Sequence, residues 1–178
     1  MSLAYIALGA NLPNSAGPPE ATLAAAAERL AALGRITARS SLYSTAPVGF
    51  PDQPRFANAV VALETHLSPN DLLDGLFAIE HDFGRDRAAS VLNGPRTLDL
   101  DILFYGDLVL AASGLEIPHP RFAGRAFVLV PLHEIAPDLR DPRSGKTVVE
   151  MLQALTDHVE HGAVARIECG PWTDNIVR

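Results

Sequence analysis

Residues 94–105 show the clearest alternation of apolar and polar positions in the chain. Gly94-Pro95 predicts a turn, because proline fixes φ and glycine tolerates strained backbone conformations. The residues that follow alternate with a period of two, which predicts a strand. One face of this strand would carry Leu98, Leu100, Ile102 and Phe104, and the other face Thr97, Asp99, Asp101, Leu103 and Tyr105. Two carboxylates, those of Asp99 and Asp101, therefore point the same way.

Strand geometry separates the backbones of these two aspartates by roughly 6–7 Å. That spacing suits a shared divalent cation, or two cations bridged by one carboxylate. Hard oxygen ligands favour Mg²⁺ over zinc. A solvated strand face is the alternative, but it explains the apolar neighbours of the aspartates less well. Arg96, at the start of the strand, is a residue type that binds phosphate beside such a pair.

The remaining apolar pattern predicts a chain of alternating strands and helices. Strands are expected at residues 3–8, 36–43, 56–67, 108–110 and 163–168. An alanine-rich helix should begin near Pro19 and stop at Gly34. Further helices are expected between the cap Ser68 and Gly84, over residues 125–135 and over residues 147–155. Without repeats or a linker, residues 1–178 should form one domain, with 141–178 as a C-terminal extension.

Composition and charge argue against several classes of protein and of partner. A net charge of −7 argues against nucleic acid as an electrostatic partner. The chain has no apolar run of about 18 residues, so we expect no membrane span. Its first residues lack the basic region of a signal peptide. Cys169, the single cysteine, fits a reducing compartment. We expect a cytoplasmic monomer that binds small molecules.

Two common motifs are incomplete. Gly145-Lys146-Thr147 resembles the end of a Walker A loop, but Arg140 occupies the position of its first glycine. His133-Glu134 resembles the start of a zincin motif, but Pro137 replaces its second histidine. A nucleotide would therefore have to be bound by arginines and a carboxylate-held metal.

Six motifs in order, over residues 4–139, resemble the 6-hydroxymethyl-7,8-dihydropterin pyrophosphokinase family. They are YIALGANL, TxPxG, FANAVVALET, the run from Glu80 to Arg87, GPRTLDLDIL, and IPHPR followed by RAFVLVPLHEIAPDL. The resemblance implies a ferredoxin-like α+β sandwich, with helices packed on a central, mostly antiparallel sheet. It also implies transfer of pyrophosphate from ATP to the hydroxymethyl group of the dihydropterin, with release of AMP, in folate biosynthesis.

The resemblance also implies roles for individual residues. Asp99 and Asp101 match the aspartates that hold two Mg²⁺ ions, and with Arg85 and Arg96 they form the expected catalytic set. ATP-binding positions are matched by Glu80, Arg85, Arg87, Arg96, Ile102, His119 and Arg125. Pterin-binding positions are matched by Thr45, Val48, Phe56, Asn58 and Phe127, of which the two phenylalanines would sandwich the ring. No residue is a clear strong general base, so we expect metal activation of the hydroxyl, with Asp101 nearby.

Some positions depart from the family pattern. Leu92, Asn93 and Gly114 stand where relatives often carry basic or aromatic side chains, which predicts weaker nucleotide affinity. Loops 45–55 and 85–94 are rich in proline and glycine, and we expect them to act as lids.

Two other functions remain open. A palm-like nucleotidyl transferase or cyclase also pairs aspartates on a strand for two metals, but it would not need a ring-binding cleft. A non-catalytic ligand-binding module would give no reason for carboxylates and arginines to cluster.

Overall fold

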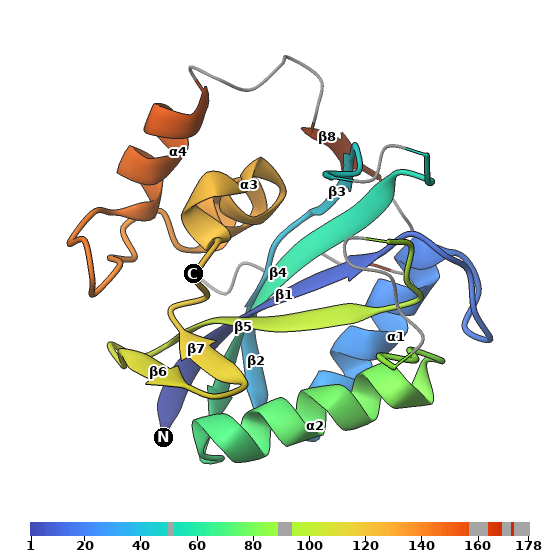
Figure 1. Cartoon of the computed structure of the whole chain (residues 1–178), viewed down its shortest axis with the longest axis horizontal. Helices are drawn as coiled ribbons and strands as arrows, with labels where there is room; N and C mark the ends of the chain where they lie inside the picture. Colours follow the sequence, from blue (N-terminus) through green and yellow to red (C-terminus); the bar gives the residue numbers. More distant parts are fainter. Residues whose placement is uncertain (50–51, 89–93, 157–163, 169–171, 173–178) are drawn as a thin grey trace.

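The computed structural model describes residues 1–49, 52–88, 94–156, 164–168 and 172, and shows helices on both faces of a central sheet (Figure 1). The strands are β1 (Ser2–Ala10), β2 (Arg35–Arg39), β3 (Leu42–Thr45), β4 (Phe56–Thr65), β5 (Asp99–Tyr105), β6 (Leu110–Ala112), β7 (Leu115–Ile117) and β8 (Val164–Ile167). The helices are α1 (Pro19–Leu30), α2 (Pro69–Asp82), α3 (Ala126–Ile135) and α4 (Val148–Thr156), with a 3₁₀ turn, η1, at Phe122–Gly124.

The main sheet has the strand order β5-β1-β4-β3-β8, and β2 pairs with β4 beside β3. Every pairing in it is antiparallel. If β2 and β3 are counted as one interrupted strand, the chain follows a β-α-β-β-α-β path from β1 to β5, with the last strand next to the first. This is the ferredoxin-like arrangement, so the predicted fold class is confirmed.

The two faces of the sheet carry separate hydrophobic cores. Helices α1 and α2 cover one face, where residues such as Leu8, Leu23 and Leu76 are buried. Helices α3 and α4 cover the other, where Val60 and Leu129 are buried. The central strands β1 and β4 are therefore covered on both sides, which makes them rigid supports for side chains at their ends.

Strand β5 departs from the predicted alternation at its C-terminal end. Its register with β1 shifts between Tyr5 and Ile6, so that Leu103 has no partner and forms a bulge. Phe104 consequently joins Leu103 in the core beneath α3, and Tyr105 packs toward the α2 side. The prediction that Phe104 shares a face with Leu100 was wrong, because a bulge interrupts the period of two.

Other boundaries also differ from those expected: β1 is longer at both ends than residues 3–8, and α1 ends at Leu30 rather than at Gly34. The strand predicted over residues 36–43 is broken at Ser40 and Ser41 into β2 and β3. Both serines are buried. The Ser40 hydroxyl accepts a hydrogen bond from the backbone N–H of Val60 in β4, which stabilises the chain at this break. The hairpin strand expected at 108–110 begins at Leu110 instead, and pairs with β7, which was not predicted. Strand β4 ends at Thr65 rather than at residue 67.

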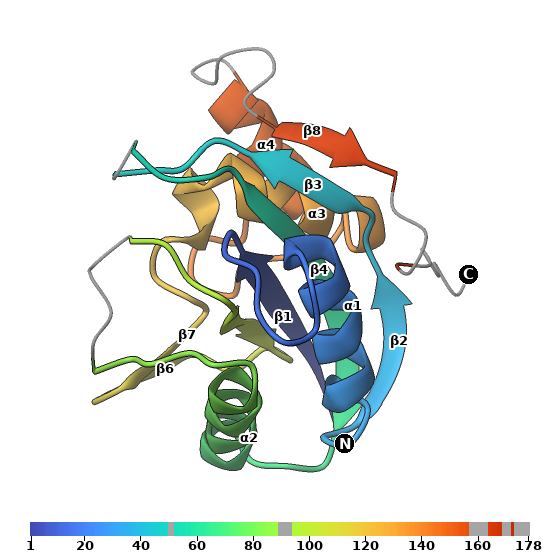
Figure 2. The ribbon, with the colours of Figure 1, turned by 90° about the vertical axis from the view of Figure 1, so that its right-hand side faces the viewer.

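The C-terminal part of the chain returns to the sheet. Strand β8 lies along β3 at the sheet edge (Figure 2), close to the predicted span of 163–168. Trp172 is buried, and its indole N–H donates a hydrogen bond to the Ser40 carbonyl over 2.7 Å. Among the described helices, none is long and apolar enough to cross a bilayer.

Candidate active site

The two predicted metal ligands lie side by side at the N-terminal half of β5. Asp99 faces two arginines, with its oxygens 3.1 Å from Arg96 Nε and 3.6 Å from Arg85 Nη2. Asp101 lies 3.9 Å from His119 Nε2. The strand therefore carries both carboxylates into one polar cluster, as the alternation predicted.

Asp101 carries a charge that its surroundings do not fully compensate. Burial, followed by the charges of Asp99 and Glu80, raises the pKa of Asp101 to about 6, although Arg125 and Arg87 oppose the shift. A carboxylate whose charged form is disfavoured in this way favours a bound cation, because a cation would stabilise that charged form. Within the described part of the chain, no third acidic, histidine or cysteine side chain completes a metal-binding group. The remaining oxygen ligands would have to come from substrate or water.

The guanidinium of Arg85 is buried with part of its hydrogen-bonding capacity unused. Its Nε and Nη1 atoms have no hydrogen-bond partner among the described residues. Burial lowers the pKa of Arg85, and Asp99 partly restores it. Buried donors without partners cost free energy, so such an arginine is typical of a site that receives an anionic ligand.

His119 is held through its backbone and through one side of its ring. Its backbone N–H donates to the Leu103 carbonyl, and its Nδ1 accepts a hydrogen bond from the backbone N–H of Arg121 over 3.1 Å. Burial, with Arg125 and Arg121 nearby, lowers the pKa of His119 to about 4. The ring is therefore neutral at pH 7, and because Nδ1 is an acceptor the proton lies on Nε2, on the side of Asp101.

Glu80 and Arg87 bind each other. The Glu80 side chain is 1% exposed, and its two oxygens accept hydrogen bonds of 2.7 and 2.8 Å from Arg87. It also accepts a hydrogen bond from the backbone N–H of Leu100, in β5. Burial raises the pKa of Glu80, while these donors oppose the shift. This predicted ATP-binding pair thus connects the end of α2 to the strand that carries the aspartates.

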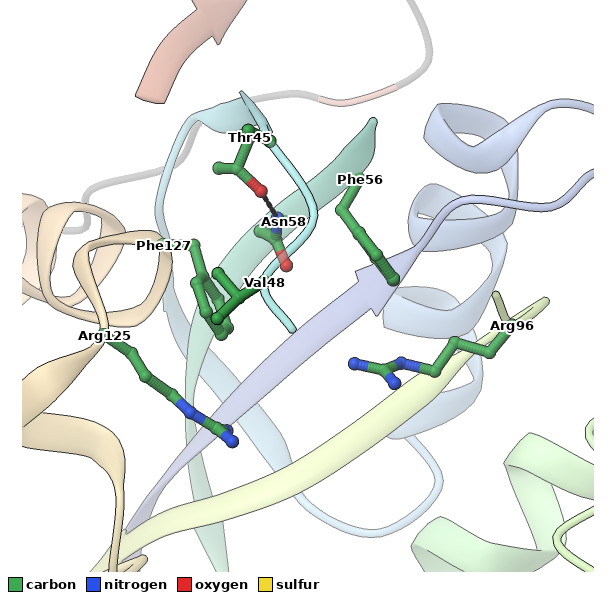
Figure 3. A pocket seen from close by; sticks show the side chains of 8 residues that line it. Thr45, Val48, Phe56, Asn58, Arg96, Arg125 and Phe127 are labelled. Carbon is green, nitrogen blue, oxygen red and sulfur yellow. Dashed lines mark hydrogen bonds between the residues drawn. The ribbon is translucent and has the colours of Figure 1, made fainter. Parts of the chain in front are cut away.

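The predicted pterin-binding residues line one cleft (Figure 3). It is lined by Thr45, Ala46, Val48, Phe56, Asn58, Arg96, Arg125 and Phe127. Phe56 and Phe127 lie on opposite sides of it in this view. Asn58 is buried and donates a hydrogen bond of 2.7 Å to Thr45 Oγ1. Flat apolar faces with a buried amide between them suit a planar ring with a polar edge.

Each of the two phenylalanines also contacts a predicted phosphate-binding arginine. The guanidinium of Arg96 lies 4.9 Å from the ring centre of Phe56, and that of Arg125 lies 5.4 Å from the ring centre of Phe127. These are cation–π distances. The cationic and aromatic parts of the site are therefore in direct contact.

The ring cleft continues into the polar cluster and beyond it. An adjoining hollow shares Asn58 and Arg125 with the cleft and adds Asp99, Asp101 and His119. A further hollow lies on the other side of Asp101 and His119, and is lined by Leu73, Phe77, Arg87, Asp101, Ile102, Ala112, Gly114, Leu115, Glu116, His119 and Pro120. All fourteen predicted site residues thus lie along this path or, for Glu80 and Arg85, in the hollow beside Arg87.

Asn11 is a site residue that the sequence did not indicate. Its Oδ1 accepts a hydrogen bond from Arg96 N over 2.8 Å, and its Nδ2 donates to Gln53 Oε1 and to the Pro54 carbonyl. It is buried. Asn11 therefore joins the backbone of Arg96 to the proline-rich loop. It lies in the YIALGANL motif, but no role was predicted for it.

Arg143 supports the segment around His119 from outside. It donates a hydrogen bond of 2.8 Å to the Pro118 carbonyl and lies 3.1 Å from Glu116 Oε1. No motif marked this residue, because it lies beyond the segment on which the family resemblance rests. Leu92, Asn93 and parts of both predicted lids (residues 50–51 and 89–93) lie outside the described residues.

Comparisons with known proteins agree with this geometry. The model of the family described as "7,8-dihydro-6-hydroxymethylpterin-pyrophosphokinase (HPPK)" matches residues 5–137. A 2-amino-4-hydroxy-6-hydroxymethyldihydropteridine pyrophosphokinase from Pseudomonas aeruginosa is 51% identical over 152 residues, which cover 84% of this chain and 90% of the relative. A Synechocystis protein of the same name is 47% identical over 154 residues, which cover 85% and 75%.

A solved structure shows the same fold. The crystal structure of an HPPK-DHPS in complex with substrates has a TM-score of 0.71 at 14% identity, and the match covers 93% of this chain. The chain spans about half of that longer protein, 46% of its length. The chain belongs to the 7,8-dihydro-6-hydroxymethylpterin pyrophosphokinase family, the diphosphotransferases that transfer pyrophosphate from ATP to the hydroxymethyl group of dihydropterin in folate biosynthesis.

Proposed function

We propose that pyrophosphoryl transfer takes place along the path from the ring cleft, past Asp99 and Asp101, to the hollow beside Ile102. The observation that carries this proposal is that the pair of carboxylates lies between the ring cleft and the buried donors of Arg85. The pterin would lie between Phe56 and Phe127, with its polar edge at Asn58 and Thr45 and with Val48 at the rim of the cleft. The nucleotide would lie on the other side, against Ile102.

Asp99 and Asp101 are the residues that would hold Mg²⁺, and two ions are proposed. The residues present fit this ion, because two oxygen ligands share a strand face and the pKa of Asp101 is raised by burial and by the negative charges of Asp99 and Glu80. Bound Mg²⁺ supplies charge neutralisation of the phosphates and polarisation of the reacting oxygens.

The positive side chains would bind and orient the triphosphate. Arg85 offers two unused donors at Nε and Nη1, and His119 offers a neutral N–H donor at Nε2. Arg96 and Arg125 would stabilise the negative charge that develops when the hydroxymethyl oxygen attacks the β-phosphorus and the α–β bridging bond breaks. The electron pair of that bond leaves with AMP, and the proton of the hydroxymethyl group is released to water. Arg87, held by Glu80, would fix the end of the triphosphate.

The compartment, the oligomeric state and the domain organisation are also proposals. The single cysteine supports a reducing compartment such as the cytoplasm. We expect a monomeric, single-domain enzyme with residues 141–178 as an extension, and the packing of β8 and Trp172 on the sheet supports the single domain.

Two variants test the division of the site into a ring cleft and a phosphate region. Phe127→Ala removes one wall of the cleft, and we expect it to raise the Kd of the pterin at least tenfold, because stacking against an aromatic face is lost. It should leave the Kd of an α,β-methylene ATP analogue within about twofold of wild type. Arg85→Ala should raise the Kd of the analogue at least tenfold and leave the Kd of the pterin within about twofold of wild type. Isothermal titration calorimetry in the presence of Mg²⁺ measures both values. If both variants weaken the same ligand, the proposed division is wrong.

A further inference from the structure

Glu134, in the last turn of α3, binds the start of strand β3 through three hydrogen bonds. Its Oε2 accepts from the Ser41 backbone N–H over 2.8 Å and from the Tyr43 hydroxyl over 3.0 Å. Its Oε1 accepts from the Ser41 hydroxyl over 2.6 Å. Hydrogen bonds to an ionised carboxylate are shorter and stronger than neutral ones, so this contact ties two elements that are more than ninety residues apart in the sequence.

The opposite ends of the same two elements form walls of the ring cleft. Phe127 lies in the first turn of α3, and Thr45 is the last residue of β3. Both line the cleft, which Figure 3 shows between them. A ten-residue helix is about 15 Å long, so a small rotation of α3 about its Glu134 end displaces Phe127 relative to Thr45.

The other contacts of α3 with the sheet are less directional. Val128, Leu129 and Leu132 are buried in the core beneath the helix, and apolar packing resists separation more than it fixes an angle. The Glu134 contact also reaches the polar edge of the cleft, because Tyr43 is opposite Asn58 in the β3–β4 register. Asn58 in turn donates its hydrogen bond to Thr45 Oγ1.

We propose that Glu134 is a positioning residue that sets the width of the ring cleft by fixing the angle between α3 and β3. It touches neither substrate nor metal in this account. The proposal rests on the proposed function, since it assumes that the pterin binds between Phe56 and Phe127. Of the residues on the nucleotide side, Arg125 alone adjoins α3, as its N-cap. The others lie on or just before β5, in or after α2, or in the segment around His119, and do not depend on this contact.

The test is the substitution Glu134→Gln, which keeps the size of the side chain and replaces one acceptor oxygen by a donor. We expect the Kd of 6-hydroxymethyl-7,8-dihydropterin, measured by calorimetry with Mg²⁺ and the α,β-methylene ATP analogue, to rise about tenfold. The Kd of the analogue alone should stay within about twofold of wild type. Tyr43→Phe removes one donor and leaves α3 intact, and it should raise the pterin Kd by roughly threefold.

Two controls separate positioning from loss of stability and from failure of the cleft assignment. Leu132→Val weakens the packing of the same helix but keeps the Glu134 hydrogen bonds, and it should lower Tm without changing the pterin Kd. The inference is overturned if Glu134→Gln leaves the pterin Kd unchanged while Phe127→Ala raises it, or if Leu132→Val raises it as much. If Phe127→Ala has no effect, the cleft assignment fails and the inference fails with it.

Discussion

The residues of the polar cluster are arranged for a ligand rather than for stability. Asp101 has a raised pKa because it is partly buried beside other carboxylates, and Arg85 has buried donors that no described residue satisfies. Both features cost folding free energy in the absence of ligand. Such local costs are common in active sites, where charge must already be in place when the substrate binds.

The first prediction concerns Asp101→Asn. A carboxylate whose pKa is raised on folding stabilises the fold most below its unfolded pKa, and this contribution is lost as the pH rises through about 6. Removing the charge should therefore raise Tm at pH 7.5 by a few degrees, and by less at pH 5. The gain is smaller than the full pKa shift implies, because the Asp101 side chain is 39% exposed and solvent screens its charge.

Thermal unfolding of the ligand-free protein, followed by circular dichroism at both pH values, measures this effect. A lower Tm for the variant at pH 7.5 would contradict it. Glu150→Gln is a suitable control, because Glu150 is a surface carboxylate whose pKa is lowered by hydrogen bonds from Thr147. Glu150→Gln should lower Tm at neutral pH, whereas Asp101→Asn should raise it.

Individual site residues were predictable where a motif marked their type and spacing. The pairing of Asp99 with Asp101 followed from alternation alone, and the remaining roles followed from the family resemblance. Asn11 and Arg143 were not predictable, because each acts through a contact between segments far apart in the sequence. Sequence spacing carries no information about such contacts.

At the scale of elements, the helices and strands were predictable where one face is buried without interruption. Helix α2 begins where its cap indicated, with the Ser68 hydroxyl accepting a hydrogen bond from Asp71 N. The bulge at Leu103 and the break at Ser40 were missed, because each changes which side chains face the core without changing the local composition.

The second prediction concerns the cap of α2. Ser68→Ala should lower the free energy of unfolding by about 1 kcal/mol, since it leaves the first turn without its side-chain acceptor. Activity should be unchanged at temperatures where the protein is folded, because the cap lies at the opposite end of α2 from Glu80. Urea unfolding measures the change, with Asn70→Ala, an exposed position in the same turn, as the control. Equal effects of both variants would contradict a capping role.

At the scale of the whole molecule, residues after 140 complete the fold on which the site is built. Strand β8 pairs with β3, whose last residue, Thr45, lines the ring cleft. Trp172 donates to Ser40 at the break between β2 and β3, and Arg39 lies 5.8 Å from its ring centre. The sequence predicted a C-terminal extension with a helix and a strand here, but it contains no motif that indicates how this segment packs on the sheet.

The third prediction concerns Trp172→Ala. Removing a buried indole should lower the free energy of unfolding by about 3 kcal/mol, whereas Trp172→Phe should cost less because most of the apolar contact remains. The ATP-analogue Kd should be unaffected, since the hydrogen bond and the ring contact of Trp172 join it to Ser40 and Arg39 and not to the residues proposed to bind the nucleotide. Urea unfolding followed by circular dichroism gives the stability of both variants. A change below about 1 kcal/mol for the alanine variant would show that the indole does not hold the tail on the sheet.

The most direct measurement of the central claim is AMP formation from ATP, 6-hydroxymethyl-7,8-dihydropterin and Mg²⁺ by wild type and by Asp101→Asn. The account predicts AMP that depends on both the pterin and Mg²⁺, with a rate at least a hundredfold lower for the variant although it remains folded. Release of pyrophosphate in place of AMP, or equal rates for the two proteins, would contradict pyrophosphoryl transfer at the Asp99 and Asp101 pair.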